Sequence, residues 1–289
     1  MFRMTFVSFG ENWRSTCVAL ASAILALCCV ATGSSHGSDE TTAPSEKEQR
    51  SKRRLEIMKS AIDDFKVSTK ADSPESALKF APNPLLRYND ETRGFLDAGV
   101  WRLGETGRPR ALVTIELYRY REETALLTYE FLSLTSSQLS LASPRDVRWS
   151  PGGTDLKIAV MPDAPVPADS AKSRLLQMRQ LARRFAAHEE LKGDKVECRL
   201  MPQPIDRYDD SAHGIVDGAI LVFANGTNPE IGLLLECGKN DWSYGVLRLS
   251  SAALTLDLDG KSVYQVEPFN NYIMTSPYTA TRHTVALPE

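Results

Sequence analysis

The chain of 289 residues is long enough for one large domain or two small ones. Apolar residues make up 42% of it, which is typical of a globular protein and excludes a largely disordered one. The formal net charge is −3, from 34 basic and 37 acidic residues. This balance gives no electrostatic basis for binding nucleic acid or for a polybasic membrane patch.

Residues 1–33 have the order of a secretory signal. Two arginines precede an apolar run of 15 residues at 17–31, and small residues follow it. The run is shorter than the roughly 20 residues that a spanning helix needs. We therefore predict a signal peptide or, if it is not cleaved, an N-terminal anchor, which would be the protein's one membrane contact. A lipid anchor at Cys28 is a weaker alternative, because Leu27 stands where a small residue is expected. In each case the bulk of the chain is predicted to be exported, to the periplasm, the outside or the outer face of a membrane.

One motif occurs twice in the chain, with a spacing of 120 residues. The segment 82–97 matches the segment 202–217 at seven of 16 positions without a gap. The correspondence extends in both directions, so that roughly 52–141 matches 172–256. A repeat at a fixed spacing indicates two copies of one structural unit.

Each copy opens with the apolar spacing of an amphipathic helix, and Asp169 or Ser170 can cap the second helix. Alternating strands with hairpin loops at 104–107 and 225–227 follow. The predicted fold class is α+β, a tandem internal repeat whose units are related by a pseudo-two-fold axis. Each unit is a helix packed on an antiparallel β-meander, and the choice between one continuous sheet and two lobes stays open. The helical apolar faces are Leu55, Met58, Ile62 and Phe65, then Leu175, Met178, Ala182 and Phe185.

The composition between the copies sets the predicted boundaries. The first unit is expected to span 51–150 and the second 169–289, whose end has no counterpart in the first. Residues 34–50 are rich in charged and small side chains, which predicts a disordered linker. Residues 151–168 are rich in proline and glycine, which predicts a linker between the units.

The repeated pattern P-x-P-x-x-R-Y-x-D-x-x-x-G-x-x-D supplies the candidate ligand-binding residues. Arginine offers a planar fork of donors for a carboxylate or phosphate, and tyrosine has a flat face that can stack on a sugar. The alternative is structural: an arginine and an aspartate three residues apart hold a loop, the tyrosine packs beneath it, and the glycine takes a positive φ. Solvent exposure decides between the two. The candidates are Arg87, Tyr88, Asp90 and Asp97 in the first copy, and Arg207, Tyr208, Asp210 and Asp217 in the second.

Other chemistry is sparse in the sequence. Glu116 and Glu236 lie on matching predicted strands, and with Asp97 or Asp217 they are candidates for a pair of carboxylates as in glycosidases; the alternative is that they face solvent. No histidine or cysteine cluster has metal-ligand spacing, and no phosphate loop or dinucleotide fingerprint occurs. We therefore expect no metal and no cofactor, and catalytic residues remain unknown.

Cys198 and Cys237 are the two cysteines beyond the N-terminal segment. They fall in the same copy, and an exported protein meets an oxidising environment, so they are a candidate disulfide. The alternative is that each is a small buried apolar residue, because leucine occupies the matching positions in the first copy.

The chain resembles a group of uncharacterised exported proteins from planctomycete-type bacteria, and the run 82–97 carries the resemblance. The resemblance implies export and no particular activity, and it assigns no catalytic residue. The residues favour a non-catalytic binding or structural protein of the cell envelope whose partner is a protein or a glycan. One alternative is a hydrolase of an exported polymer that uses acidic residues near the repeated motif. Another is an assembly component that oligomerises through the repeat.

Overall fold

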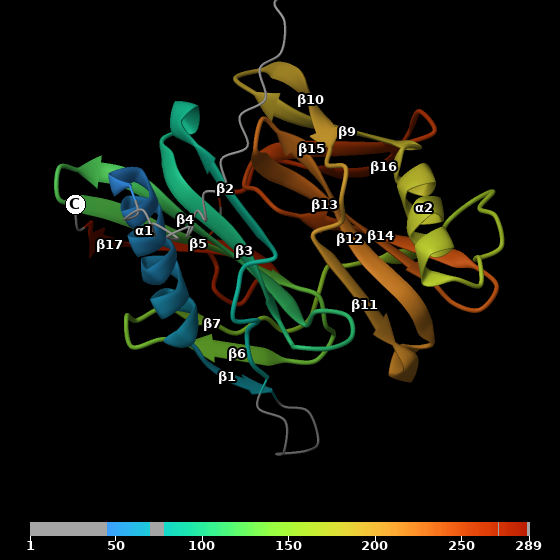
Figure 1. The fold of residues 1–289 in the computed structure, drawn as a ribbon, viewed down its shortest axis with the longest axis horizontal. Coiled ribbons are helices and arrows are strands. Elements are labelled where there is room, and N and C mark those ends of the chain that lie inside the picture. The colour runs from blue at the N-terminus through green and yellow to red at the C-terminus, as the bar shows by residue number, and fades with distance from the viewer. Residues whose placement is uncertain (1–44, 70–77, 271, 288–289) are drawn as a thin grey trace, which may run out of the picture. The chain divides into compact units, whose positions relative to one another are not determined.

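Strands dominate the computed structural model, which describes residues 45–69, 78–270 and 272–287 (Figure 1). Half of the structure is strand and 15% is helix, with two α-helices among the described residues. The predicted α+β class is therefore wrong, and the protein is mostly β. The predicted signal or anchor at 1–33 lies outside the described residues, as does most of the predicted linker at 34–50.

The first helix, α1 (Glu46–Asp63), begins inside the segment that was expected to be disordered. Ser45 caps it: the Glu48 backbone N–H donates to the Ser45 hydroxyl at 3.3 Å, and the Ser45 N–H donates to the Glu48 carboxylate at 2.8 Å. This reciprocal pair is a capping box, which satisfies two N–H groups that the first helical turn leaves free. The helix buries Met58 and Ile62 of the predicted apolar face.

The second helix, α2 (Ala171–Ala182), is capped by Ser170, as predicted: its hydroxyl accepts a hydrogen bond from the Ser173 N–H at 3.1 Å. The predicted apolar faces ran on to Phe65 and Phe185, but both helices end before these residues. Phe65 and Phe185 are nevertheless buried in the cores. Neither helix of the described residues combines the length and the apolar character needed to cross a membrane.

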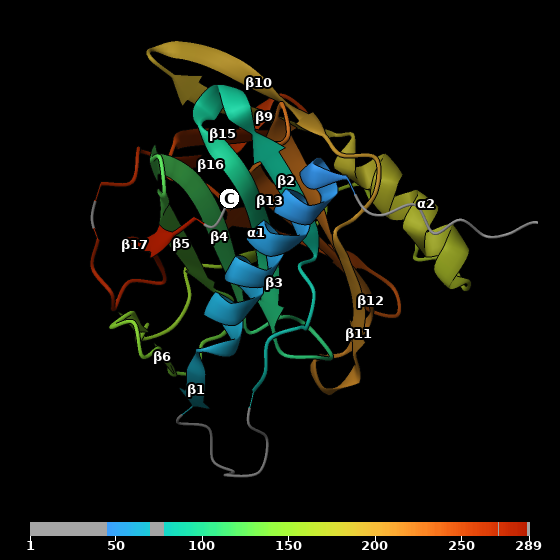
Figure 2. The same ribbon diagram turned by 60° about the vertical axis from the view of Figure 1, so that its left-hand side comes forward.

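A five-stranded antiparallel sheet contains most of the first copy and takes its last strand from the C-terminus (Figures 1 and 2). Helix α1 crosses one face of this sheet and contacts β3 and β4. The predicted hairpin at 104–107 joins β3 and β4. In spatial order the strands are β17 (Tyr278–Ala286), β5 (Thr124–Ser133), β4 (Ala111–Arg121), β3 (Phe95–Leu103) and β2 (Leu86–Asp90).

A nine-stranded sheet holds the second copy, and α2 contacts its β12 and β13. The predicted hairpin at 225–227 joins these two strands. The order is β16 (Lys261–Val266), β15 (Ala253–Leu258), β9 (Phe185–Leu191), β10 (Asp194–Leu200), β12 (Ile215–Asn225), β13 (Asn228–Cys237), β14 (Trp242–Arg248) and β8 (Ile158–Val160), with β11 (Asp206–Asp210) paired to β12. A small third sheet consists of β1 (Lys66–Thr69), β6 (Leu139–Ala142) and β7 (Arg148–Trp149).

The two copies differ in how their strands pair, which is the physical reason for the wrong fold class. By the 120-residue spacing β1 corresponds to β9, and after a five-residue shortening in the second copy β6 corresponds to β15. The first pair forms a separate small sheet, whereas the second pair belongs to the large sheet. Strand β8 lies within the predicted linker 151–168, and β17 lies within the second predicted unit but pairs with β5 of the first. The copies are therefore not two equivalent meanders.

Three apolar clusters form the core. One lies between α1 and the five-stranded sheet and includes Met58 and Trp101, and a second lies beneath α2 around Met178 and Trp242. The third joins the other faces of the two sheets, with side chains from both copies such as Val100 and Ile220. Strand β13 is consequently buried on both faces, which explains its continuous apolar sequence.

Candidate functional site

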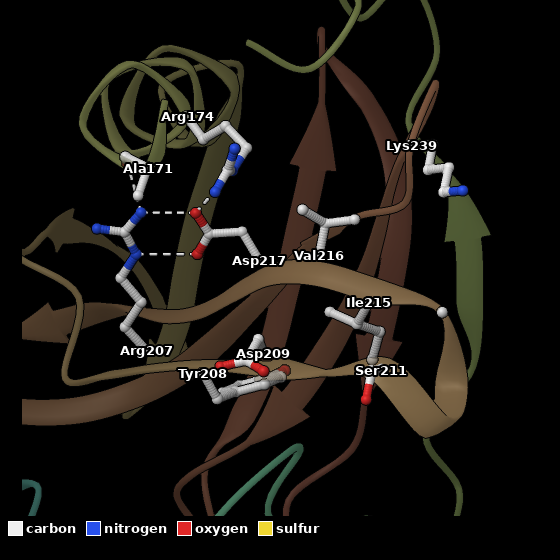
Figure 3. A pocket seen from close by; sticks show the side chains of 11 residues that line it. Ala171, Arg174, Arg207, Tyr208, Asp209, Ser211, Ile215, Val216, Asp217 and Lys239 are labelled. Atoms are coloured by element: carbon white, nitrogen blue, oxygen red, sulfur yellow. Dashed lines mark hydrogen bonds and ion pairs between the residues drawn. The ribbon is translucent and has the colours of Figure 1, made fainter. Parts of the chain in front are cut away.

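The repeated motif of the second copy lies where α2 meets the paired strands β11 and β12 (Figure 3). Arg207 donates two parallel hydrogen bonds to Asp217, from Nε at 2.9 Å and from Nη2 at 2.6 Å. Arg174, from α2, donates to the same carboxylate at 2.9 Å. Asp217 is 4% exposed, so two cations balance one buried carboxylate. The hydrogen bond to Asp217 is the main cause of the raised pKa of Arg207.

The first copy has the same pairing of the motif arginine with the second aspartate, which we call the motif fork, but only one cation bonds to the aspartate. Arg87 Nε donates to Asp97 at 2.9 Å, and its Nη2 donates to the Ser51 hydroxyl of α1 at 2.8 Å. Arg54 occupies the position of Arg174 but donates to the Leu96 carbonyl at 3.0 Å. In both copies the arginine therefore ties a helix to a strand, and its partner is the second aspartate of the motif. The predicted pairing of residues three apart is wrong.

The motif tyrosines are buried, with exposures of 6% for Tyr88 and 7% for Tyr208. Their hydroxyls donate to Glu116 at 3.1 Å and to Glu236 at 2.6 Å. A Cβ atom at Gly218 would lie 2.5 Å from the Tyr208 ring, so the ring lies directly on the backbone. Neither ring is available to stack on a sugar.

The first aspartate of each motif precedes a short 3-10 turn and faces the other copy. Asp90 accepts from the Thr92 N–H at 3.0 Å in η1 (Glu91–Arg93). Asp210 precedes η2 (Ser211–His213), pairs with His213 at 2.9 Å and accepts from the Arg108 N–H, in the other copy, at 3.2 Å. Burial opposes ionisation of both carboxyls, but these hydrogen bonds lower their pKa values.

These contacts show that the eight predicted ligand residues hold helices, strands and turns of the fold together. Gly94 and Gly214 take positive φ angles of 84° and 72°, as the structural interpretation of the motif predicted. The four aspartates are each bonded to an arginine, a hydroxyl, a histidine or backbone N–H groups. None of them has the open setting that an acid or base needs to reach a substrate.

The proposed carboxylate pairs do not form, for a reason visible in the register of the strands. Asp97 pairs with Leu117, and Ala98 pairs with Glu116. Because side chains alternate between the two faces of a strand, Asp97 and Glu116 point to opposite sides of the sheet. The second copy has the same arrangement, since Asp217 pairs with Cys237. Glu116 and Glu236 are buried rather than exposed to solvent.

Sequence reasoning missed an ionic network between the copies. Arg93 donates to Glu230 at 2.8 Å and to Glu189 at 3.0 Å, and these carboxylates are 0% and 3% exposed. Arg108 donates to Glu236 at 2.8 Å. Both arginines come from the first copy and all three glutamates from the second. Glu189 is followed by a second glutamate on its strand, and Glu230 and Glu236 lie near the two ends of a largely apolar strand. Residue spacing therefore gave no sign that arginines of the first copy would pair with them.

Two open cavities flank the motif forks. The cavity of the second copy has a volume of about 650 Å³ and contains Arg174, Arg207 and Lys239 against Asp209 and Asp217 (Figure 3). The cavity of the first copy has about 440 Å³ and is lined by four cations against one carboxylate. Those charged residues are Lys47, Arg50, Arg54, Arg87 and Asp97. The first cavity therefore has the larger excess of positive charge.

The candidate disulfide is absent: Cys198 and Cys237 are free, buried thiols. Cys198 lies beside Arg199, which pairs with Ala224 near the end of β12, whereas Cys237 pairs with Asp217 near its start. The cysteines are therefore well beyond the roughly 7 Å between Cα atoms that a disulfide tolerates. The interpretation of both as small buried residues agrees with the structure.

We expect neither thiol to react in the native protein. Burial raises the pKa of Cys198 to about 12 and that of Cys237 to about 11, which keeps both protonated at neutral pH. Iodoacetamide labelling followed by peptide mass spectrometry should leave both unmodified in buffer and modify both in concentrated denaturant. Labelling of either in buffer would show that its strand opens locally.

In the described part of the chain, no group of three or more histidine, cysteine, aspartate or glutamate residues is arranged to hold a metal ion. Comparison of the chain with family models, curated proteins and solved structures found no match.

Proposed function

We propose that this is a non-catalytic binding protein that works outside the cytoplasm and holds anionic groups of an exported polymer. The predicted signal or anchor at 1–33 supports the location. The observation that carries the binding proposal is the cavity beside α1, where four cations meet one carboxylate. That carboxylate, Asp97, is already engaged by Arg87. Arg50 also forms an exposed ion pair with Glu46 at 3.6 Å, whereas the charges of Lys47 and Arg54 have no matching acid in the cavity lining.

The chemistry of these cations fits a carboxylate or a phosphate. The Arg87 guanidinium is held in place by Asp97 and Ser51, so it loses little conformational freedom when a ligand arrives. Lys47 and Arg50 are exposed on the first turns of α1. Negative groups are also favoured near the N-terminus of a helix by its dipole. The cavity beside α2 has a similar arrangement with a smaller excess of positive charge.

The experiment compares polyphosphate and polyglutamate with neutral dextran by calorimetry at two salt concentrations. We expect both polyanions to bind, to weaken with salt and to stay intact, whereas dextran should not bind. The double variant Lys47→Glu/Arg50→Glu should lose at least about tenfold in affinity, because each change replaces attraction by repulsion. Both positions are exposed, so the fold should survive.

The control is Lys195→Glu/Lys261→Glu, which makes the same change in net charge at exposed positions on β10 and β16. We expect it to bind polyanions nearly as the wild type does. If neither polyanion binds, or if both double variants lose affinity equally, the cavity beside α1 is not a specific site. Shortening of the polymer during incubation would contradict the non-catalytic proposal.

A further inference from the structure

A separate cavity of about 370 Å³ lies over β4, β5 and β17, and it uses none of the residues of the two motif cavities. It opens on the face of the five-stranded sheet that is turned away from α1. The segment after β16, with Phe269 and Tyr272, lines its other side. Its volume falls within the usual range for small-ligand sites.

The strand register places two glutamates on the floor of this cavity. Thr128 pairs with Glu116 on one side and with Arg282 on the other. Glu130 is two residues further along β5, so its side chain points to the same face as that of Thr128. Glu116 and Glu130 are thus diagonal neighbours on adjacent strands, and both line the cavity.

The two carboxyl groups differ in their partners. Glu116 accepts hydrogen bonds from Tyr88 at 3.1 Å and from Tyr118 at 2.9 Å. Glu130 is 8% exposed, and its Oε2 atom has no hydrogen-bond partner among the described residues. The Tyr278 hydroxyl lies close enough to oppose the rise in the pKa of Glu130, but it makes no hydrogen bond of normal geometry to the carboxyl. A buried oxygen without a hydrogen-bond partner lowers the stability of the fold, and a hydrogen bond from a ligand hydroxyl would remove this cost.

The raised pKa values of Glu116 and Glu130 suit a ligand rich in hydroxyl groups. Burial raises the pKa of Glu116 to about 7, and burial together with the charge of Glu116 raises the pKa of Glu130 well above its usual range. These shifts favour the protonated form of Glu130, which offers an O–H donor, while Glu116 offers acceptor oxygens. A sugar hydroxyl both donates and accepts, so it can meet both groups.

The walls and the rim add two further recognition elements. Phe269 and Tyr272 pack edge to face with ring centroids 5.9 Å apart, and Tyr272 is 65% exposed. Such amphipathic rings match the apolar face of a sugar. Arg282 is exposed at the rim and pairs with Thr128, so it shares the cavity face, where its planar donors can bind a carboxylate.

We propose that this cavity binds one uronic acid unit of an exported acidic glycan. The sugar ring lies against Phe269 and Tyr272, a ring hydroxyl bonds to Glu130, and the sugar carboxylate faces Arg282. This inference rests on the proposed function only in taking the ligand to be an acidic polymer. It adds a site for the sugar unit itself.

The test measures binding of tetragalacturonate to the full chain by calorimetry, with maltotetraose as the neutral counterpart. We expect tetragalacturonate to bind at least about tenfold more tightly than maltotetraose. Tyr272→Ala should weaken binding about tenfold or more, whereas Tyr120→Ala, at a tyrosine of β4 that is 49% exposed and outside the cavity, should not. Glu130→Gln should retain binding, because an amide still donates, and Glu130→Leu should lose it.

The outcome separates this site from the cavity beside α1. Lys47→Glu/Arg50→Glu should lose polyphosphate binding while largely keeping tetragalacturonate binding. Equal affinity for the acidic and the neutral tetrasaccharide, or wild-type affinity in Tyr272→Ala, would overturn the uronate site. Polyphosphate binding that still depends on Lys47 and Arg50 would then leave the proposed function standing.

Discussion

Replacement of Arg93 by Met is expected to destabilise the protein by about 3–5 kcal/mol near pH 8. Arg93 is the cation between Glu189 and Glu230, which are both buried, and the substitution leaves two carboxylates without it. Asn225 and Asn228 still donate to these glutamates, but they carry no charge. The measurement is the free energy of unfolding in urea, obtained from fluorescence at equilibrium.

Two comparison variants make this result specific. Arg148→Met breaks an ion pair with Asp146 in which both side chains are at least 75% exposed, so it should change stability by less than about 1 kcal/mol. The triple variant Arg93→Met/Glu189→Gln/Glu230→Gln removes the stranded charges and should recover most of the loss. A triple variant as unstable as Arg93→Met alone would show that packing of the Arg93 side chain, and not charge, holds the copies together.

The importance of Arg93 was not visible in the sequence. It lies inside the repeated motif, at a position that is His213 in the second copy, so the comparison of copies gave no reason to single it out. Its partners are 96 and 137 residues away. A glutamate on a strand is normally expected to face solvent, and only the packing of one sheet against the other buries these two.

The motif itself was predictable as scaffold, but its pairing was not. The sequence placed an arginine, a tyrosine and two aspartates in each copy, together with a glycine of positive φ. The choice of Asp97 over Asp90 as the partner of Arg87 depends on how β2 pairs with β3, which brings Arg87 opposite Gly99. A bulge between Tyr88 and Asp90 turns Asp90 toward the 3-10 turn instead. Neither the register nor the bulge follows from residue spacing.

The prediction of the fold class was wrong for a similar reason. Local patterns identified both helices and the main hairpins, since these depend on neighbouring residues. They did not indicate where β17 would pair, and this C-terminal strand closes the sheet of the first copy beside β5. The cavity over β4, β5 and β17 therefore had no sequence signal, because Glu130, Phe269 and Arg282 meet only through that long-range pairing.

Glu116→Gln is expected to stabilise the protein above pH 7 and to leave it nearly unchanged near pH 4. Burial raises the pKa of Glu116 from 4.5 to about 7, so the folded wild type keeps a proton that the unfolded chain releases. Wild-type stability should therefore fall as pH rises from about 4.5 to about 7, by about 3 kcal/mol from this residue. The amide of Glu116→Gln does not titrate, so the unfolding free energy of this variant should not show the decrease between about pH 4.5 and about pH 7.

The measurement is the difference in unfolding free energy between Glu116→Gln and the wild type at steps from pH 4 to pH 8. This difference cancels the other titrating groups that both proteins share. Glu130→Gln should act in the same direction, because burial first and the Glu116 charge second raise the pKa of Glu130. A difference that is constant across the pH range would mean that Glu116 has the same pKa in the folded protein as in the unfolded chain, and is therefore ionised at neutral pH. The hydroxyls of Tyr88 and Tyr118 would then hold a carboxylate rather than an acid, and the floor of the cavity would repel a uronate.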